Sequence, residues 1–335
     1  MRTPNRWLGC LAAALVASCD AAGPLEPAGP DAPAGPPSQT AMARGRPADL
    51  VEQGRRLFFE ETFGGNGRTC GTCHPTPSLV LTPADIAVLP PDDPFFAGVM
   101  DFDPERAREG MIRYPLGGAS LFEPEMIVFR GIPTIRNVGR TAPFTTDGRA
   151  ANLREQALEA AMLHLLDGGV DEPGERLPTD AELDAIVAFE EAMQEPETGG
   201  VGLNRLSPAA RDGRRLFMGQ AACATCHVPP LFTDNAFHNI VAAGGETAAD
   251  PGRCRIDPST ADCWSGSAFN TPQLRGVRQG APFFHDNSLP TLRSVVQFYN
   301  SERFATSPAA RRLGIGPLLL TDAEIEAVVA FLEEI

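Results

Sequence analysis

Apolar residues recur at helical spacing in two segments that have nearly the same sequence. Residues 179–189 read TDAELDAIVAF, and residues 321–331 read TDAEIEAVVAF. Each segment begins with T-x-x-E, a capping box in which the Thr and Glu side chains satisfy free backbone N–H groups at a helix start. The pattern predicts two amphipathic helices of the same kind. Their apolar positions follow the i, i+3, i+4, i+7 spacing of one helix face: Leu183, Ile186 and Val187 in the first segment, and Ile325, Val328, Val329 and Leu332 in the second.

The duplication extends through most of the chain after residue 48. The sequence GRRLF occurs at residues 54–58 and again at 213–217, each time within a short helical pattern. Residues 133–147 align with residues 272–286 without a gap, at an offset of 139. Each copy therefore contains an opening helix, long loops, a middle helix and a closing helix. We expect a mainly α fold of two tandem helical domains, residues 48–200 and 201–335, with long irregular loops.

Charge and hydropathy restrict the classes of partner. The 335 residues include 28 basic and 43 acidic side chains, a formal charge of −15, and every basic residue is Arg. Without Lys or a strongly basic run, nucleic acid is not an expected partner. Outside the extreme N-terminus, no uninterrupted apolar run approaches the 18 residues that a membrane span requires.

Four of the eight cysteines lie in two copies of the motif C-x-x-C-H. The copies are Cys70–His74 and Cys223–His227. This is the attachment motif of c-type haem, in which two thiols bond to the haem vinyl groups and the adjacent imidazole binds iron. The alternatives are a redox-active or a zinc-binding C-x-x-C. Because each copy of the repeat contains one motif, we expect one covalent haem c in each cytochrome c-like domain, attached through Cys70 and Cys73 or through Cys223 and Cys226, with His74 and His227 as iron ligands.

The remaining cysteines indicate an exported protein. Two Arg residues precede the apolar stretch Trp7–Ala17, which has the length and charge order of a secretory signal. The run Val16–Cys19 resembles a bacterial lipoprotein signal, so residues 1–18 are predicted to be the signal peptide and Cys19 the lipid anchor. Residues 19–47, rich in Pro, Gly and Ala, are expected to be a tether. The expected location is the periplasm or cell envelope, with contact to the membrane through the lipid; the alternative is ordinary cleavage and release into the periplasm.

Cys254 and Cys263 lie nine residues apart in a loop rich in Gly, Pro and Asp. In an exported protein a disulfide is the simplest interpretation. Two free buried thiols are the alternative.

Several segments together resemble the bacterial di-haem cytochrome c peroxidase and MauG superfamily. They are the two C-x-x-C-H motifs, residues 146–156, residues 226–234, and residues 271–277 with 281–286. The resemblance covers about residues 48–335. It implies hydrogen peroxide as substrate, and a small redox protein or residues of a partner protein as electron donor. The resemblance also makes a calcium ion between the domains a candidate cofactor.

For the second haem, the sequence limits the sixth iron ligand. No Met follows His227, so a His/Met electron-transfer haem is not expected. The downstream candidates are His238, His285 and Tyr299. Tyr299 lies on the apolar face of the middle helix, and the resemblance points the same way, because at this spacing peroxidases carry Met and MauG carries Tyr. A core Tyr with a hydrogen-bonded hydroxyl is the alternative. The resemblance implies a haem-propionate or supporting contact for His285, and His238 is a weaker case of the same role.

For the first haem, the repeat provides a comparison. At the offset of 139, Tyr299 corresponds to Ala160, so the first haem lacks a ligand at the matching place. His164 is the only His between the two haem motifs, and we expect it to act as a ligand or as an acid/base for O–O cleavage. A propionate or helix-end contact is the alternative for His164. Gln156 matches a pocket Gln of the family. Met residues that also remain candidate ligands of this haem are Met100, Met111, Met126 and Met162.

Two positions depart from the family. Thr146 stands where the family usually has the Trp between the haems, and the acid expected further along the helix falls near Leu166. We still expect a peroxidase-type oxidoreductase, with peroxide bound at the first haem and the second haem as its redox partner. The rival interpretation is a non-enzymatic di-haem electron-transfer cytochrome.

Overall fold

The computed structural model describes residues 48–335 except 77, 98–102, 118–124, 166–172, 195–204, 241–249 and 264–265. All described residues belong to one compact unit. The predicted signal peptide, the tether and Cys19 lie outside the described residues, as do Met100 and Leu166.

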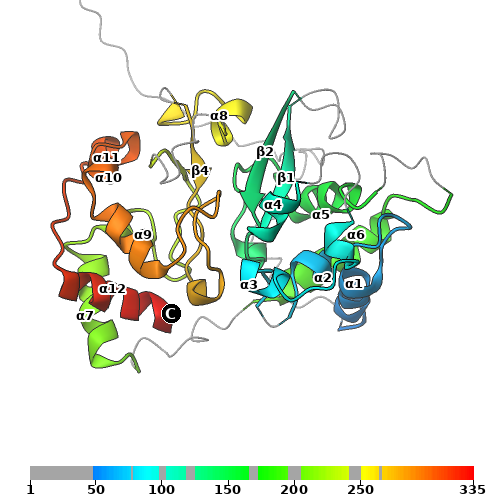
Figure 1. Ribbon diagram of the computed structural model, residues 1–335, viewed down its shortest axis with the longest axis horizontal. Helices are drawn as coiled ribbons and strands as arrows, with labels where there is room; N and C mark the ends of the chain where they lie inside the picture. Colours follow the sequence, from blue (N-terminus) through cyan, green and yellow to red (C-terminus); the bar gives the residue numbers. More distant parts are fainter. Residues whose placement is uncertain are drawn as a thin grey trace, which may run out of the picture. The chain divides into compact units, whose positions relative to one another are not determined.

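The described chain is rich in helix and contains only two small sheets (Figure 1). The elements of the first copy are α1 (Ala48–Glu60), α2 (Cys70–Cys73), α3 (Pro83–Ile86), η2 (Pro94–Phe96), α4 (Pro104–Arg108), β1 (Met111–Leu116), β2 (Met126–Gly131), η3 (Val138–Arg140), α5 (Leu153–Met162) and α6 (Asp180–Ala192). Those of the second copy are α7 (Pro208–Met218), η5 (Cys223–Thr225), β3 (Phe237–His238), α8 (Arg253–Ile256), β4 (Phe269–Asn270), η8 (Val277–Gln279), α9 (Leu292–Tyr299), α10 (Glu302–Ala305), α11 (Pro308–Leu313) and α12 (Asp322–Glu334). The mainly α character predicted from the sequence is confirmed.

The closing helices begin at the predicted capping boxes. The Thr179 side chain accepts a hydrogen bond from the backbone N–H of Glu182 at the start of α6, and Thr321 accepts one from Glu324 at the start of α12. In each case the Glu carboxylate accepts from the backbone N–H of the Thr, at 2.8 Å. Local sequence therefore sets where both helices start.

The repeated Gly of GRRLF explains how the opening and closing helices of each copy pack. A Cβ on Gly54 of α1 would lie 1.9 Å from the Ala185 carbonyl oxygen of α6, and one on Gly213 of α7 would lie 1.8 Å from the Ala327 carbonyl oxygen of α12. Only a residue without a side chain permits so close an approach of two helix backbones. Figure 1 shows the corresponding pairs, α1 with α6 and α7 with α12.

Buried apolar residues form separate cores in the two copies. One cluster joins Phe58, Ala157, Ile186 and other residues of the first copy, and a second joins Phe217, Val296, Phe331 and other residues of the second. The packing of each copy is therefore largely its own, as expected of a duplicated unit.

The structure contains a β-hairpin between α4 and η3 that was not predicted from the sequence. Strands β1 and β2 pair antiparallel, with Met111 opposite Gly131 and Leu116 opposite Met126. The hairpin contributes Tyr114 and Arg130 to the interior. A shorter antiparallel pair joins β3 to β4.

Hydrogen bonds also connect residues of the two copies. The Asn270 N–H donates to the Thr146 carbonyl oxygen at 2.9 Å, and the Gly131 N–H donates to the His285 carbonyl oxygen at 2.7 Å. The predicted disulfide between Cys254 and Cys263 is present. Within the part of the chain that the structure describes, no helix has both the length and the apolar character needed to cross a membrane.

Candidate functional site

Both motif histidines are held in the form that binds iron. The Nδ1 atom of His74 lies 3.1 Å from the Leu79 carbonyl oxygen, and Nδ1 of His227 lies 2.9 Å from the Phe232 carbonyl oxygen. A carbonyl only accepts, so Nδ1 carries the proton and Nε2 keeps its lone pair. Burial lowers the pKa of His74 to about 4, and burial also lowers the pKa of His227. Both imidazoles are therefore neutral at physiological pH.

Residues of both C-x-x-C-H motifs line one large cavity. Its volume is about 660 Å³, within the usual range for cofactor pockets. Cys70, Cys73, Cys223 and Cys226 line it, and none of the four is in a disulfide. Burial raises the pKa of Cys70 and of Cys223 to about 12. Because a dithiol redox site needs a thiolate at neutral pH, thiols with so high a pKa do not fit the redox alternative.

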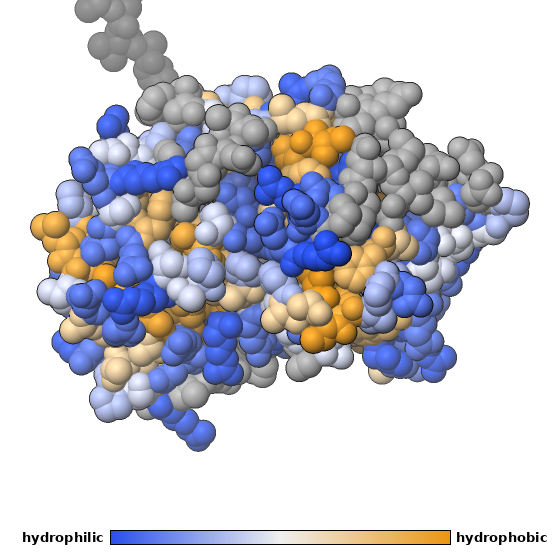
Figure 2. Space-filling view, in the orientation of Figure 1, coloured by the Kyte–Doolittle hydropathy of each residue, from blue (hydrophilic) through white to orange (hydrophobic). Residues whose placement is uncertain are grey.

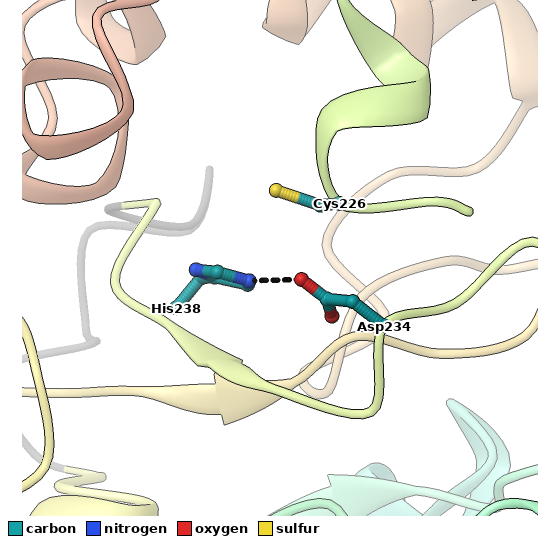
Figure 3. A group of neighbouring side chains, drawn as sticks. All are labelled: Cys226, Asp234 and His238. Carbon is teal, nitrogen blue, oxygen red and sulfur yellow. Dashed lines mark hydrogen bonds and ion pairs between the residues drawn. The ribbon is translucent and has the colours of Figure 1, made fainter.

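The zinc alternative also fits poorly. Among the described residues, Cys226, Asp234 and His238 alone gather in a possible metal-binding group, which combines only one motif cysteine with two residues from outside the motif (Figure 3). In this group His238 Nε2 lies 2.9 Å from Asp234 Oδ2, and His238 Nδ1 lies 2.8 Å from Arg312 Nη2. Since a guanidinium only donates, Nδ1 of His238 accepts and Nε2 donates to the carboxylate. Both ring nitrogens are occupied, so His238 does not offer a lone pair to a metal.

Helix α5 and the turn that follows it present side chains to the cavity from the first copy. Gln156, Glu159, Ala160 and His164 all line it. His164 is 8% exposed, and its Nδ1 atom has no hydrogen-bond partner. Burial, with smaller contributions from Arg68 and His74, lowers the pKa of His164 to about 4. A neutral imidazole with an unpaired nitrogen in a cavity can act as a ligand or as a proton acceptor.

Tyr299 is the corresponding group of the second copy. It ends helix α9, lines the cavity, and packs against Phe298 and Phe304 with ring centroids 5.4 and 4.8 Å away. Burial raises its pKa above the ordinary range.

At matched positions the two copies differ in chemistry. At the offset of 139, Gln156, Glu159 and Ala160 correspond to Val295, Phe298 and Tyr299. The first copy thus has two polar groups and a small residue where the second has two apolar groups and a phenol. Glu159 was missed by the sequence analysis, although this offset comparison could have found it; burial raises its pKa.

The other predicted site residues have mixed surroundings. His285 lines the cavity with its ring stacked on Phe269 at a centroid distance of 3.7 Å. Met111 also lines the cavity, whereas Met126 is 39% exposed on the hairpin, over which Figure 2 shows apolar surface. Met162 lies at the end of α5 and is not among the residues that line the cavity.

At the position of the family Trp, the structure has an ionic cluster. The Arg130 guanidinium donates to the Thr146 hydroxyl at 3.1 Å and to Asp147 at 2.7 Å. The Cζ atoms of Arg130 and Arg149 lie 4.6 and 4.2 Å from the ring centroid of Tyr114. No local sequence signal marked Arg130 or Tyr114, because their partners are distant in the chain or lie on the unexpected hairpin.

The fold and the two histidine sites fit the class of helical proteins built to hold two c-type haems. The fit rests on two neutral imidazoles with Nε2 available, two pairs of unbridged cysteines, and a largely apolar cavity shared by both motifs.

Comparisons with known proteins narrow this class. No protein-family model matches the chain. It is 27% identical to the methylamine utilization protein MauG of Methylorubrum extorquens, over 85% of this chain and 77% of that protein. It is 26% identical to the cytochrome-c peroxidase IdrP2 of Denitromonas iodatirespirans, over 87% of this chain and 82% of that protein.

Solved structures agree on the fold. A MauG-like protein associated with microbial copper homeostasis matches with a TM-score of 0.61 and 20% identity, covering 87% of this chain and 90% of that one. The di-haem peroxidase BthA of Burkholderia thailandensis matches with a TM-score of 0.56 and 20% identity, covering 87% and 86% of the two chains. The chain is thus similar in sequence to MauG and cytochrome-c peroxidase proteins, and similar in fold to a MauG-like protein and a di-haem peroxidase.

Proposed function

We propose that this protein is a di-haem c-type oxidoreductase that reduces hydrogen peroxide. One haem c would be attached through Cys70 and Cys73 with His74 as iron ligand, and the other through Cys223 and Cys226 with His227. When bound, a haem iron with an open position supplies peroxide binding and reduction, and a six-coordinate haem supplies electron storage and transfer. The similarity to curated peroxidases and MauG proteins supports this class of activity.

The assignment of roles rests on the difference between the two copies. At matched positions, the first copy offers Gln156, Glu159 and Ala160 to the cavity, whereas the second offers only Val295 and Tyr299. A peroxide needs room and proton-transferring groups beside it, which favours the first copy as the peroxide site. The Tyr299 phenol favours the second as the redox partner, because a phenolate stabilises an oxidised iron.

Two residues of α5, and His164 in the turn after it, would bind peroxide and transfer its protons. The Gln156 amide can donate to a peroxide oxygen and fix its orientation. His164, neutral and with an unpaired Nδ1, can accept the first peroxide proton. The Glu159 carboxyl, whose pKa is raised by burial, is the proposed donor of a proton to the leaving oxygen. The reaction then consumes one peroxide, two protons and two electrons to give two waters.

The source of electrons follows from charge. The chain carries a net charge of −15 and has no Lys. Complementary charge accelerates encounter and selects partners, so a basic redox protein, or a basic surface of a partner protein, is the proposed donor.

Export and anchoring remain part of the proposal. Arg2 and Arg6 before an apolar stretch, with Cys19 behind it, support secretion and a lipid anchor in the periplasm or cell envelope. His285, stacked on Phe269 in the cavity, is proposed as a cofactor-binding residue. The calcium ion implied by the resemblance stays a prediction; the group of three neighbouring ligand side chains found among the described residues is Cys226, Asp234 and His238.

The test is the oxidised spectrum of the protein with and without stoichiometric peroxide, also after partial reduction, in the wild type and in His164→Ala. We expect a high-spin fraction and a reaction with peroxide in the wild type. If His164 moves protons, the variant keeps its resting spectrum and reacts roughly 100-fold more slowly. If His164 is a ligand, the variant gains high-spin haem. Met162→Leu, two residues earlier at the end of α5, is the matched control. A wholly low-spin wild type that is inert to peroxide would support the electron-transfer cytochrome instead.

A further inference from the structure

A buried carboxyl group lines the cavity from the closing helix of the first copy. Glu190 of α6 is 4% exposed, and its Oε2 atom has no hydrogen-bond partner in the described structure. Native proteins pair nearly all buried polar atoms, so an unpaired carboxyl oxygen facing a cofactor cavity requires an explanation.

The carboxyl lies close enough to the first haem attachment site to act on it. Glu190 and Cys70 both line the cavity. Burial raises the pKa of the Cys70 thiol, and the negative charge of Glu190 raises it further. A change in charge at either group is therefore felt at the other, because a water-excluded interior screens charge weakly.

The second copy shows what the fold requires at this position. Helices α6 and α12 begin at Thr179 and Thr321, so Glu190 corresponds to Leu332. Leu332 is also buried and also lines the cavity. An apolar side chain is thus sufficient for packing, and the carboxyl group of the first copy serves something other than packing.

No ion pair fixes the charge of Glu190 among the described residues. Burial, and then repulsion from Glu191 on the same helix, raise the pKa of Glu190 to about 8. Helix α1, which packs against α6, carries Glu52, Arg55 and Arg56, which pair with one another at the surface, and also Asp49 and Glu60. Helix α5 carries Arg154, which pairs with Asp180 and Asp184 at the start of α6, together with Glu155 and the cavity-lining Glu159, and η3 carries Arg140.

We infer that Glu190 is the proton-binding group linked to the oxidation state of the first haem. Reduction there adds one electron from the donor, and one proton from solvent binds the Glu190 carboxylate to give the neutral acid. Oxidation removes the electron and releases the same proton. The physical reason is that a carboxylate beside the haem compensates the extra positive charge of the oxidised iron, and is unfavourable when that charge is removed. The inference rests on the proposed haem at Cys70–His74, and not on the reaction with peroxide.

The test is a redox titration of the di-haem protein, followed by absorption from about pH 6 to about pH 10. In the wild type, the reduced-to-oxidised ratio of the first haem at fixed potential should fall up to tenfold per pH unit, about 59 mV for a one-electron couple. Glu190→Gln, a neutral group of the same shape, should remove this dependence and keep the potential at its acid-side value. Glu190→Leu installs the residue of the second copy and should do the same if the Gln variant fails to fold.

The controls separate this role from a structural one. Glu191→Gln should keep the pH dependence of the first haem, and the second haem should be unaffected in every variant. A dependence that persists in Glu190→Leu, or is lost in Glu191→Gln, would overturn the assignment of Glu190. Peroxide takes no part in the titration, so loss of peroxide reactivity leaves the result intact. If no haem is found at Cys70–His74, both this inference and the proposed function fail.

Discussion

Arg130 and Asp250 form a buried two-point ion pair, although 120 residues separate them in the chain. The Nε–Oδ2 and Nη2–Oδ1 distances are both 2.8 Å, and Arg130 is 2% exposed. Arg130 lies on β2 of the first copy, whereas Asp250 belongs to the second. The pair therefore fixes one copy against the other beside Tyr114, which lines the cavity.

Removing the carboxylate should weaken the whole molecule. Asp250→Ala leaves a buried guanidinium with only part of its charge compensated, and we expect a loss of about 3 kcal/mol in the free energy of unfolding. Arg55→Gln breaks the exposed pair with Glu52 and should cost far less, because solvent screens an exposed pair. Urea unfolding of the two variants measures both values. Equal losses would show that burial of the Arg130 pair contributes nothing.

Tyr299→Phe should change the spectrum of one haem only. The phenol oxygen is the group that would reach the second iron, and its removal leaves the ring packing against Phe298 and Phe304 in place. Tyr114→Phe is a matched control, because Tyr114 is the only other Tyr in the chain. Absorption and electron paramagnetic resonance spectra of the oxidised proteins distinguish the variants. Two unchanged haem spectra in Tyr299→Phe would remove Tyr299 from the ligand set.

The helices and the two histidine motifs were accessible from sequence because they depend on local signals and on the repeat. Capping boxes place α6 and α12, and the C-x-x-C-H motifs mark His74 and His227, but that both line one cavity follows only from the fold. The β1–β2 hairpin was not predicted, since the apolar and polar residues of Met111–Leu116 do not alternate in a strand pattern. The hydrogen bond between Arg312 and His238 could not be predicted either, because the two residues lie 74 positions apart. The carboxyls of Glu159 and Glu190 could have been noticed by comparing the copies position by position.

Glu159→Gln should slow the reaction with peroxide without altering the resting spectra. The amide keeps the shape of the side chain but cannot donate a proton at neutral pH, and loss of a general acid typically costs 100-fold or more in rate, on the order of 10²–10⁴. Glu155→Gln, on an exposed turn of the same helix, should react at the wild-type rate. Stopped-flow absorption after mixing with peroxide gives both rates. A wild-type rate in Glu159→Gln would assign proton transfer to His164 alone.

The Cys254–Cys263 disulfide should stabilise the loop around α8. The two cysteines lie nine residues apart in the sequence. For a loop of this length, the chain-entropy account gives a stabilisation of roughly 2 to 3 kcal/mol. The double variant Cys254→Ser/Cys263→Ser should lose about this amount in urea unfolding, while its two haem spectra stay those of the wild type. If the double variant is as stable as the oxidised wild type, the disulfide adds nothing to the free energy of unfolding.

Glu190→Leu should change how stability depends on pH. Burial raises the pKa of Glu190 from 4.5 to about 8, so between these values the folded protein holds a proton that the unfolded chain releases. The free energy of unfolding of the wild type therefore decreases as pH rises through this range, by at most about 1.4 kcal/mol per pH unit from this group. The Leu variant lacks the titration. Its advantage over the wild type should grow from about pH 5 to about pH 8, as measured by urea unfolding at several pH values, with Glu191→Gln as the control. A constant difference across this range would mean that Glu190 titrates alike in the folded and unfolded states.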